Sequence, residues 1–126
     1  MKKIINTDKA PTPIGPYSQA ILKGNMLFTS GQIAINPATG DLQTETIKIE
    51  TETVMKNLKA VLKEAGMTFE HVLKATIFIS DMNSFAEVNE VYAKYFNESS
   101  APARETVEVS NLPKYVNVEI SVIASL

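Results

Sequence analysis

Two charged side chains in the last quarter of the sequence are the first candidates for chemistry. Arg104 begins a valine-rich run, and Glu119 lies in a second such run beyond a Pro-Lys turn. An arginine can bind a carboxylate through two parallel hydrogen bonds, and a glutamate can orient water and accept its proton. If the two lie close together, they could hold an acidic substrate and activate water beside it.

The alternation of side chains along a strand predicts where these two charges point. In the first run the valines share one face and Arg104 and Thr106 share the other; in the second run the aliphatic residues share one face and Glu119 lies opposite. If residues 110–115 close a local hairpin, Thr106 lies across from Glu119 and Arg104 is its diagonal neighbour. The sequence therefore predicts both charges on one surface, away from the valine core.

The same arrangement also has a purely structural interpretation. A cross-strand arginine and glutamate on the wet side of an antiparallel pair form a surface ion pair, which contributes between zero and about 1 kcal/mol. Strand alternation alone does not distinguish this pair from an active site.

The elements that would position these residues follow from hydrophobic periodicity. Residues 18–36 read as a hairpin that turns at Gly24-Asn25, with Gly31 interrupting or ending its second strand. Between residues 46 and 65 apolar residues recur every three or four positions, which predicts a one-sided helix that Gly66 ends.

A second helix and three further strands complete the predicted fold. Residues 71–80 are β-branched and aromatic, as expected of an interior strand. Ser84 followed by Glu87 is a capping-box signature, so a second amphipathic helix is predicted over residues 84–97. With the two C-terminal strands the order is β-β-α-β-α-β-β, an α+β or mixed sheet with both helices on one face.

Composition limits the function further. A chain of 126 residues with 44% hydrophobic residues reads as one globular domain, residues 1–126, without repeats or low-complexity tracts. It has no cysteine and one histidine, which excludes thiol chemistry and disfavours a protein-built zinc site. The N-terminus lacks an apolar segment after its lysines, so we expect a cytoplasmic protein without a membrane partner. A net charge of −2 gives no general attraction for nucleic acid.

Six segments of the sequence form a recognisable set. They are IGPYSQAI, TSGQI, NLKAVLKEAG, ATIFISDM, FAEVNEVYAKYF and PARETVEVSNLPKYVNVEISVIA. Together they resemble the RidA/YjgF family of enamine and imine deaminases, in the family's order and at its separations, from about residue 3 to residue 124.

The resemblance implies a fold, an assembly and an activity. The fold would be the chorismate-mutase-like α+β fold of the bacillus type, assembled as a homotrimer around a central barrel with ligand clefts at the subunit interfaces. The activity would be hydrolysis of 2-aminoacrylate, 2-iminobutanoate and related imino or enamino acids to 2-keto acids and ammonia, without a cofactor. Such intermediates leave pyridoxal-phosphate enzymes that dehydrate serine or threonine, and they damage other enzymes.

The resemblance also implies roles for individual residues. Arg104 would hold the substrate carboxylate, Glu119 would position and activate water, and the Gly31 amide beside Ser30 would support the bound carboxylate or a developing charge. Tyr17 would close the mouth of the pocket. Considered by themselves, Tyr17 could equally be a packing residue and Ser30-Gly31 an ordinary strand end or bulge.

Three further positions concern substrate binding and range. Asn89 matches a family position near the cleft, although it could instead be a buried asparagine bonded to backbone. Thr106 occupies a position that is often cysteine in bacterial members, so no thiol mechanism can operate, but its backbone amide could contact the ligand. Ser121 replaces a frequent second glutamate. Thr106 and Ser121 therefore leave the substrate range open.

Two other classes of function remain open at this point. The first is a ligand-sensing or regulatory trimer that binds a small carboxylate without turnover. The second is an endoribonuclease or chaperone-like activity, both attributed to relatives. The only histidine, His71, lies at a helix-to-strand junction, where we expect a solvated turn residue rather than half of an acid-base pair.

Overall fold

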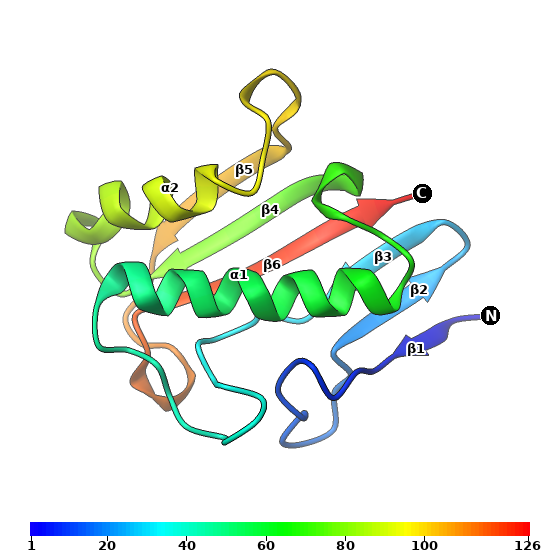
Figure 1. Ribbon diagram of the computed structural model, residues 1–126, viewed down its shortest axis with the longest axis horizontal. Helices are drawn as coiled ribbons and strands as arrows, with labels where there is room; N and C mark the ends of the chain where they lie inside the picture. Colours follow the sequence, from blue (N-terminus) through cyan, green and yellow to red (C-terminus); the bar gives the residue numbers. More distant parts are fainter.

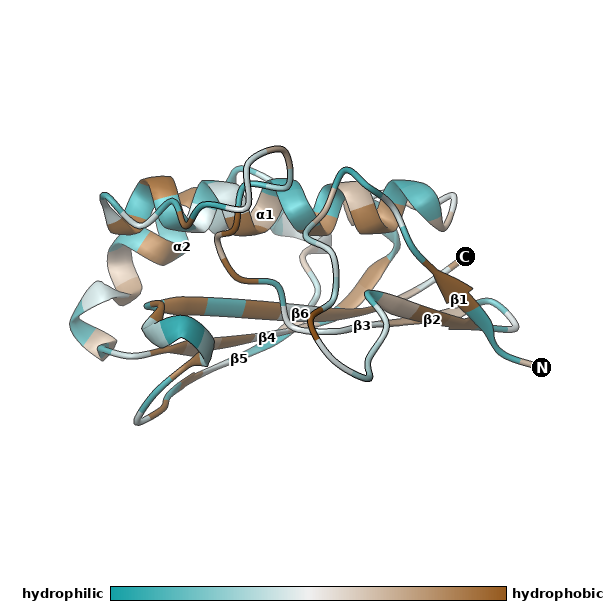
Figure 2. Ribbon diagram, turned by 90° about the horizontal axis from the view of Figure 1, so that it is seen from below, coloured by the Kyte–Doolittle hydropathy of each residue, from teal (hydrophilic) through white to brown (hydrophobic).

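Two α-helices lie across one face of a six-stranded sheet in the computed structural model, which describes all residues 1–126 (Figure 1). Figure 2 shows both helices on the same side of the sheet, as the sequence predicts. In chain order the elements are β1 (Lys3–Ile5), β2 (Ala20–Lys23), β3 (Met26–Thr29), α1 (Ile47–Glu64), β4 (Val72–Ile79), α2 (Phe85–Ala93), β5 (Ala103–Glu108) and β6 (Val118–Ser125). No helix combines the length and the apolar character that crossing a membrane requires.

The strands are not neighbours in sequence order. The sheet runs β1-β2-β3-β6-β4-β5, so the last strand of the chain occupies a central place in it. Strands β4 and β5 are parallel and joined through α2, because parallel neighbours need a crossover connection. All other neighbouring pairs are antiparallel. The predicted β2–β3 hairpin is confirmed, whereas the short edge strand β1 is absent from the predicted order.

The predicted local hairpin between the two C-terminal strands is wrong. Strand β4 lies between β5 and β6, so Thr106 pairs with Ile77 on β4, and Glu119 pairs with Phe78 on the opposite side of β4. The connection between β5 and β6 crosses the end of β4, where the Val109 N–H donates to the Ile79 carbonyl at 2.9 Å and the Ser80 N–H donates to the Asn117 carbonyl at 3.0 Å. A mainly apolar strand is expected in the interior of a sheet, and β4 lies there, between β6 and β5.

The register also places the two charges on opposite faces of the sheet. Arg104 pairs with Ala75, which is buried on the helix side, whereas Glu119 alternates with Val118 and Ile120 of the helix-side core and therefore points to the outer side. The prediction that Arg104 and Glu119 share one surface is wrong for a single chain.

Helix α1 confirms its predicted limits and covers the centre of the sheet. The Thr46 hydroxyl accepts from the Ile49 N–H at 3.1 Å, and Gly66 adopts a φ of 74°, which a glycine takes without strain. The apolar stripe of the helix, which includes Leu58 and Leu62, is fully buried in one core cluster with the inward residues of β6. This packing fixes β6 beneath α1.

Helix α2 is shorter than predicted and begins differently. The predicted capping box at Ser84 is wrong, since the Ser84 side chain makes no cap hydrogen bond. Instead Asp81 accepts from the Asn83 N–H at 2.9 Å and caps the short 3₁₀ turn before the helix. After Ala93 the chain continues as turns in which Tyr95 and Phe96 pack against Phe69.

The outer face of the sheet carries an incomplete apolar surface. Phe28 is 46% exposed and Val107 is 41% exposed, and Ile123 pairs with Phe28 on the same face. Glu119 and Ser121 interrupt this surface, and both are partly buried. Nothing in the chain covers this face in the way that the helices cover the other.

Candidate functional site

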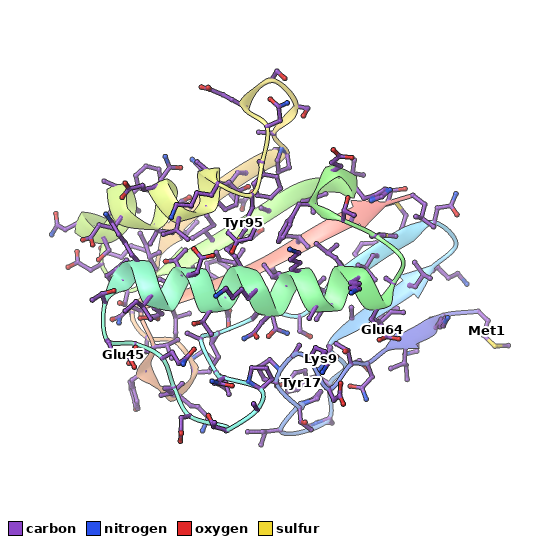
Figure 3. All side chains as sticks on the ribbon, in the orientation of Figure 1. Met1, Lys9, Tyr17, Glu45, Glu64 and Tyr95 are labelled. Carbon is purple, nitrogen blue, oxygen red and sulfur yellow. The ribbon has the colours of Figure 1, made fainter.

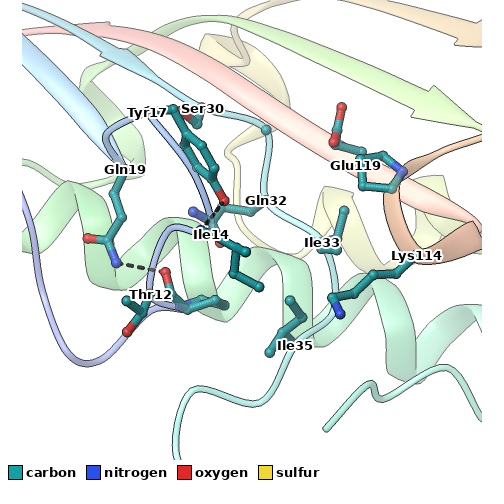
Figure 4. Close-up of a pocket in the computed structure, with 13 residues that line it drawn as sticks. Thr12, Ile14, Tyr17, Gln19, Ser30, Gln32, Ile33, Ile35, Lys114 and Glu119 are labelled. Carbon is teal, nitrogen blue, oxygen red and sulfur yellow. Dashed lines mark hydrogen bonds between the residues drawn. The ribbon is translucent and has the colours of Figure 1, made fainter. Parts of the chain in front are cut away.

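A pocket of about 500 Å³ lies where the N-terminal loop meets the segment after β3 and the start of β6 (Figure 4). Four residues predicted from the sequence line it: Tyr17, Ser30, Gly31 and Glu119. The other lining residues are Pro11, Thr12, Ile14, Gln19, Gln32, Ile33, Ile35, Pro113 and Lys114.

Gly31 and Glu119 are in close contact at one end of this pocket. A β-carbon built on Gly31 would lie 2.6 Å from the Glu119 Cδ and 2.8 Å from its Oε2. The Glu119 side chain thus lies against the Gly31 backbone, in space that any other residue would fill. The glycine is required here by close approach and not by a positive φ.

The environment of Glu119 disfavours its charged form. The carboxyl is half-buried, and this burial raises the pKa of Glu119 above the ordinary value because desolvation disfavours the charged form. The Gly31 N–H has no hydrogen-bond partner in the chain. A half-buried carboxyl with a raised pKa therefore lies against the backbone of a residue whose N–H is free.

The hydroxyls of Ser30 and Tyr17 differ in their hydrogen-bonding roles. The Ser30 hydroxyl donates to the Ser18 carbonyl at 2.6 Å, so toward a ligand it can only accept. The Tyr17 hydroxyl accepts from the Ile14 N–H at 3.4 Å, which leaves its own proton free to donate. Tyr17 is 52% exposed, and Figure 3 shows it in the N-terminal loop, on the far side of α1 from Tyr95.

Two buried amide side chains hold the walls of the pocket in place. Gln19 accepts from the Thr7 N–H and donates to the carbonyls of Thr7, Ala10 and Pro11, which ties the N-terminal loop to the start of β2. Asn57 of α1 donates to the carbonyls of Ile33 and Ile35. The loop and the segment after Gly31 are irregular backbone that these amides satisfy.

Arg104 lies elsewhere, against one face of α2. Its Nη1 donates to the Asn89 Oδ1 at 2.6 Å, and its guanidinium carbon lies 5.0 Å from the centre of the Tyr92 ring and 5.5 Å from that of Phe85. Phe85, Asn89 and Tyr92 are spaced four and three residues apart, so they share one face of the helix. That face orients the guanidinium, which is otherwise exposed.

Two buried hydroxyls near this arginine have no partner in the chain. They belong to Tyr92, whose ring faces the guanidinium, and to Thr106, two residues after Arg104 on the same face of β5. Burial raises the pKa of Tyr92, and the Arg104 charge offsets part of that shift. The Thr106 side chain therefore points into the chain, so only its backbone can face a ligand.

The predicted site residues thus fall into two groups within one chain. Tyr17, Ser30, Gly31 and Glu119 surround the first pocket. Asn89 and Arg104 line a second depression with Tyr92 and Phe96, and Thr106 follows on β5. Asn89 bonds to the Arg104 side chain and not to backbone, so the alternative interpretation as a backbone-bonded asparagine is wrong.

Several residues that line the two depressions or contact Arg104 were not identified as site residues from the sequence. Phe85 and Tyr92 could have been found from their helical spacing to Asn89, which aligns them on one face. Lys114, Ile14 and the isoleucines after Gly31 come from irregular segments, which have no periodicity to indicate where a side chain points.

His71 and the acidic side chains other than Glu119 form no second catalytic or metal site. His71 is partly exposed in a 3₁₀ turn before β4, and its Nδ1 accepts from the Thr68 N–H at 3.0 Å. This agrees with the expected turn residue. No group of three or more His, Cys, Asp or Glu side chains could hold a metal ion.

Comparison with known proteins gives consistent similarities over nearly the whole chain. The family model described as endoribonuclease L-PSP matches residues 7–126. A RutC family protein of Pyrococcus horikoshii is 55% identical over 124 residues, which cover 98% of this chain and 98% of that protein. The solved structure of YyfA from Yersinia pestis, a conserved Rid-family protein of unknown function, has a TM-score of 0.97 at 52% identity and covers 100% of both chains. The structure of TdcF from E. coli with bound serine has a TM-score of 0.92 at 43% identity and covers 98% of each chain.

Proposed function

The chain belongs to the Rid family, to which the endoribonuclease L-PSP model corresponds, and we propose that it hydrolyses reactive 2-imino acids and their enamine tautomers to 2-keto acids and ammonia. Membership of this family supports an enamine and imine deaminase role at family level. The proposed substrates are 2-iminobutanoate and the 2-iminopropanoate that forms from 2-aminoacrylate.

The contact between Glu119 and Gly31 is the observation that carries the proposal. Hydrolysis of an imine needs a group that orients water and takes its proton, and burial, which raises the pKa of Glu119, makes its carboxylate a stronger base for that task. The free Gly31 N–H beside it can stabilise negative charge on the substrate. The Tyr17 hydroxyl, with its proton free, can donate to the same ligand at the mouth of the pocket.

Arg104 is the proposed anchor for the substrate carboxylate, and it must come from a neighbouring copy. Within one chain Arg104 and Glu119 point to opposite faces of the sheet. The incomplete apolar surface on the outer face, with Phe28 and Val107 exposed, favours association of copies through that face. We therefore propose that each site lies between the Glu119 pocket of one subunit and the Arg104 edge of the next, in the homotrimer that the family resemblance implies.

The reaction then follows from the residues. Arg104 binds the substrate carboxylate through two parallel hydrogen bonds, with Asn89 and the α2 rings holding its guanidinium. Glu119 takes a proton from water as the water oxygen bonds to the imine carbon. This proton is returned to the nitrogen, whose double bond to carbon becomes single, and a carbinolamine forms. Glu119 then takes the proton of the new hydroxyl and passes it to the nitrogen, so the carbon-nitrogen bond breaks as the carbonyl forms and 2-keto acid and ammonia leave. No cofactor takes part in these steps.

A competition assay tests the proposal directly. A threonine dehydratase supplies imine while semicarbazide traps it, and 2-ketobutyrate is measured against semicarbazone with and without the protein. Wild type should divert imine to keto acid, and folded Arg104→Ala and Glu119→Ala variants should not. A wild-type protein that never outcompetes the trap would contradict the deaminase proposal.

A carboxylate-binding regulatory role is the second candidate, because TdcF was solved with bound serine. The groups that hold a carboxylate do not by themselves require turnover. Calorimetric binding of serine or 2-ketobutyrate, together with no release of ammonia from imine, would select this function.

Cleavage of RNA has weaker support, because the only residue that contacts the His71 ring through hydrogen bonds is Thr68. Incubation of the protein with single-stranded RNA tests this activity.

A further inference from the structure

The first pocket has a cation at the end away from Glu119. Lys114 lines this pocket and also an adjoining depression with Asn36 and Pro37. In Figure 4 its side chain runs away from Glu119 toward Ile35. Lys114 is exposed, and its ammonium takes part in neither of the two salt bridges of the chain, which are Lys48–Glu90 and Lys74–Glu105. Lys114 and Glu119 are the only charged residues among those that line the pocket.

The wall between the two charges is apolar. Ile14, Ile33 and Ile35 line it, and the pocket volume of about 500 Å³ falls in the range of pockets that enclose ligands much larger than a four-carbon acid. A small imino acid at Glu119 would leave the Lys114 end unfilled. The pocket therefore has room for a substrate with an apolar chain beyond the reacting carbon.

The backbone that presents Lys114 is unusual in the chain. Lys114 and Tyr115 have φ values of 56° and 55° and are its only non-glycine residues with positive φ. A left-handed conformation at a non-glycine residue costs roughly 1–2 kcal/mol, and the surrounding structure must hold it in place. Here Pro113 precedes the pair, and the Val116 N–H donates to the Pro113 carbonyl at 3.3 Å. This turn fixes the direction in which the lysine leaves the backbone.

From the unpaired ammonium, the apolar wall and the volume we propose that Lys114 recognises a second, distal anionic group, so that the pocket accepts 2-imino acids with a side-chain carboxylate. This inference rests on the proposed function for the reacting end of the substrate. The 2-imino acid of glutamate is the simplest member with an apolar segment between its two carboxylates. Its α-carboxylate would lie between Gly31 and Arg104 of the partner subunit, and its distal carboxylate near Lys114.

Binding of keto acids tests Lys114 separately from turnover. The probes are 2-ketoglutarate, its 5-methyl ester, which keeps the open chain and removes the distal charge, and 2-ketobutyrate, measured by calorimetry with wild type and Lys114→Met. Wild type should bind 2-ketoglutarate about 3- to 10-fold tighter than the ester, as expected of an exposed charge pair. Lys114→Met should remove this preference and leave the affinity for 2-ketobutyrate within twofold, roughly the error of such a comparison. Higher salt should reduce the preference in wild type.

A matched control and a turnover measurement separate the outcomes. Lys94→Met removes an exposed lysine after α2, outside this pocket, and should retain the preference. If wild type lacks the preference, binds no keto acid, or keeps the preference in Lys114→Met, the inference about Lys114 is wrong, whatever the trap assay shows. If the preference depends on Lys114 but no imine is hydrolysed, the proposed deaminase function fails and the distal anion site stands.

Discussion

Glycine is needed at position 31 because a side chain would not fit there, and not because of its backbone conformation. In Gly31→Ala the new β-carbon would require Glu119 to move, because it would otherwise lie 2.6 Å from the Glu119 Cδ. We expect deaminase turnover to fall by about 100-fold, the usual consequence of displacing a catalytic group by about 1 Å. The melting temperature should change little, since the partly exposed Glu119 side chain can swing away.

Gly24→Ala is the matched control, with the opposite expected result. Gly24 forms the β2–β3 turn with a φ of 59°, and a β-carbon there would meet nothing within 4 Å. Alanine should cost about 1 kcal/mol of unfolding free energy through backbone strain and leave turnover unchanged. Equal losses of turnover in both variants would show that the Gly31 effect is general destabilisation.

Glu119 should reduce stability at neutral pH. Its pKa is raised in the folded chain by burial, so the fold favours the protonated form and disfavours the carboxylate. Its contribution to stability is present below the ordinary glutamate pKa and is lost as the pH rises through the raised pKa. Glu119→Gln should therefore be more stable than wild type at pH 7, and the difference should disappear at acid pH.

Urea unfolding of both proteins at one concentration across this pH range measures that difference. A Glu119→Gln variant that is less stable than wild type at pH 7 would mean that the carboxylate has a stabilising partner in the assembly. The kinetics give a second test of the same residue. Turnover by wild type should fall as the pH drops through the raised pKa of Glu119, because a protonated carboxyl cannot take the proton of water.

At the scale of elements, a buried glutamate joins α1 to the start of β6. The Glu50 carboxylate accepts from the N–H groups of Asn117 and Val118 and from the Asn117 side chain, at 2.7 to 2.9 Å. Glu50 is fully buried, so Glu50→Ala would leave these donors without partners. We expect a loss of about 3 kcal/mol of unfolding free energy, measured by urea titration.

Glu64→Ala provides the comparison on the same helix. Glu64 is the last residue of α1 and is exposed, so its removal should change stability by less than about 0.5 kcal/mol. A similarly small effect of Glu50→Ala would mean that water can replace the carboxylate at the start of β6. Because Asn117 and Val118 directly precede Glu119, a large effect would also connect α1 to the position of the candidate base.

The elements with a clear period were predictable, and the pairing of the last two strands was not. Helix α1 has a one-sided apolar stripe and a glycine after its end, so its limits follow from local chemistry. The alternation in β5 and β6 is the same whether they pair directly or with β4 between them. The pattern fixed which residues share a face within each strand, but not which faces of the two strands coincide. That is why Arg104 was assigned to the wrong side.

Part of the candidate site was also predictable from the sequence. The family motifs identified Tyr17, Ser30, Gly31 and Glu119, which the fold brings to one pocket from three separate segments. The α2 side chains around Arg104 follow from helical spacing once the helix is known. Lys114 could not be placed, because its direction depends on two consecutive left-handed residues that no sequence period indicates.

At the scale of the whole molecule, the sheet itself separates the proposed anchor from the proposed base. Arg104 lies on the helix side of the edge strand β5, and Glu119 lies on the outer side of the central strand β6. A single chain therefore cannot place both on one small substrate. Association through the outer face would bury Phe28 and Val107 and bring a second copy to Glu119. A change that prevents this association should therefore abolish turnover as well.

Mixing two inactive variants tests whether neighbouring subunits share the site. Arg104→Ala retains an intact Glu119 pocket, and Glu119→Gln retains an intact Arg104 edge. If each site combines halves from two subunits, unfolding and refolding the variants together at equal amounts should restore about a quarter of wild-type turnover, because random assembly pairs intact halves at that frequency. The variants refolded separately and then assayed together should stay inactive, which controls for residual activity. No recovery in mixed oligomers, confirmed by mass spectrometry of the assemblies, would place the complete site within one chain and would require Arg104 to act through a different face from the one described.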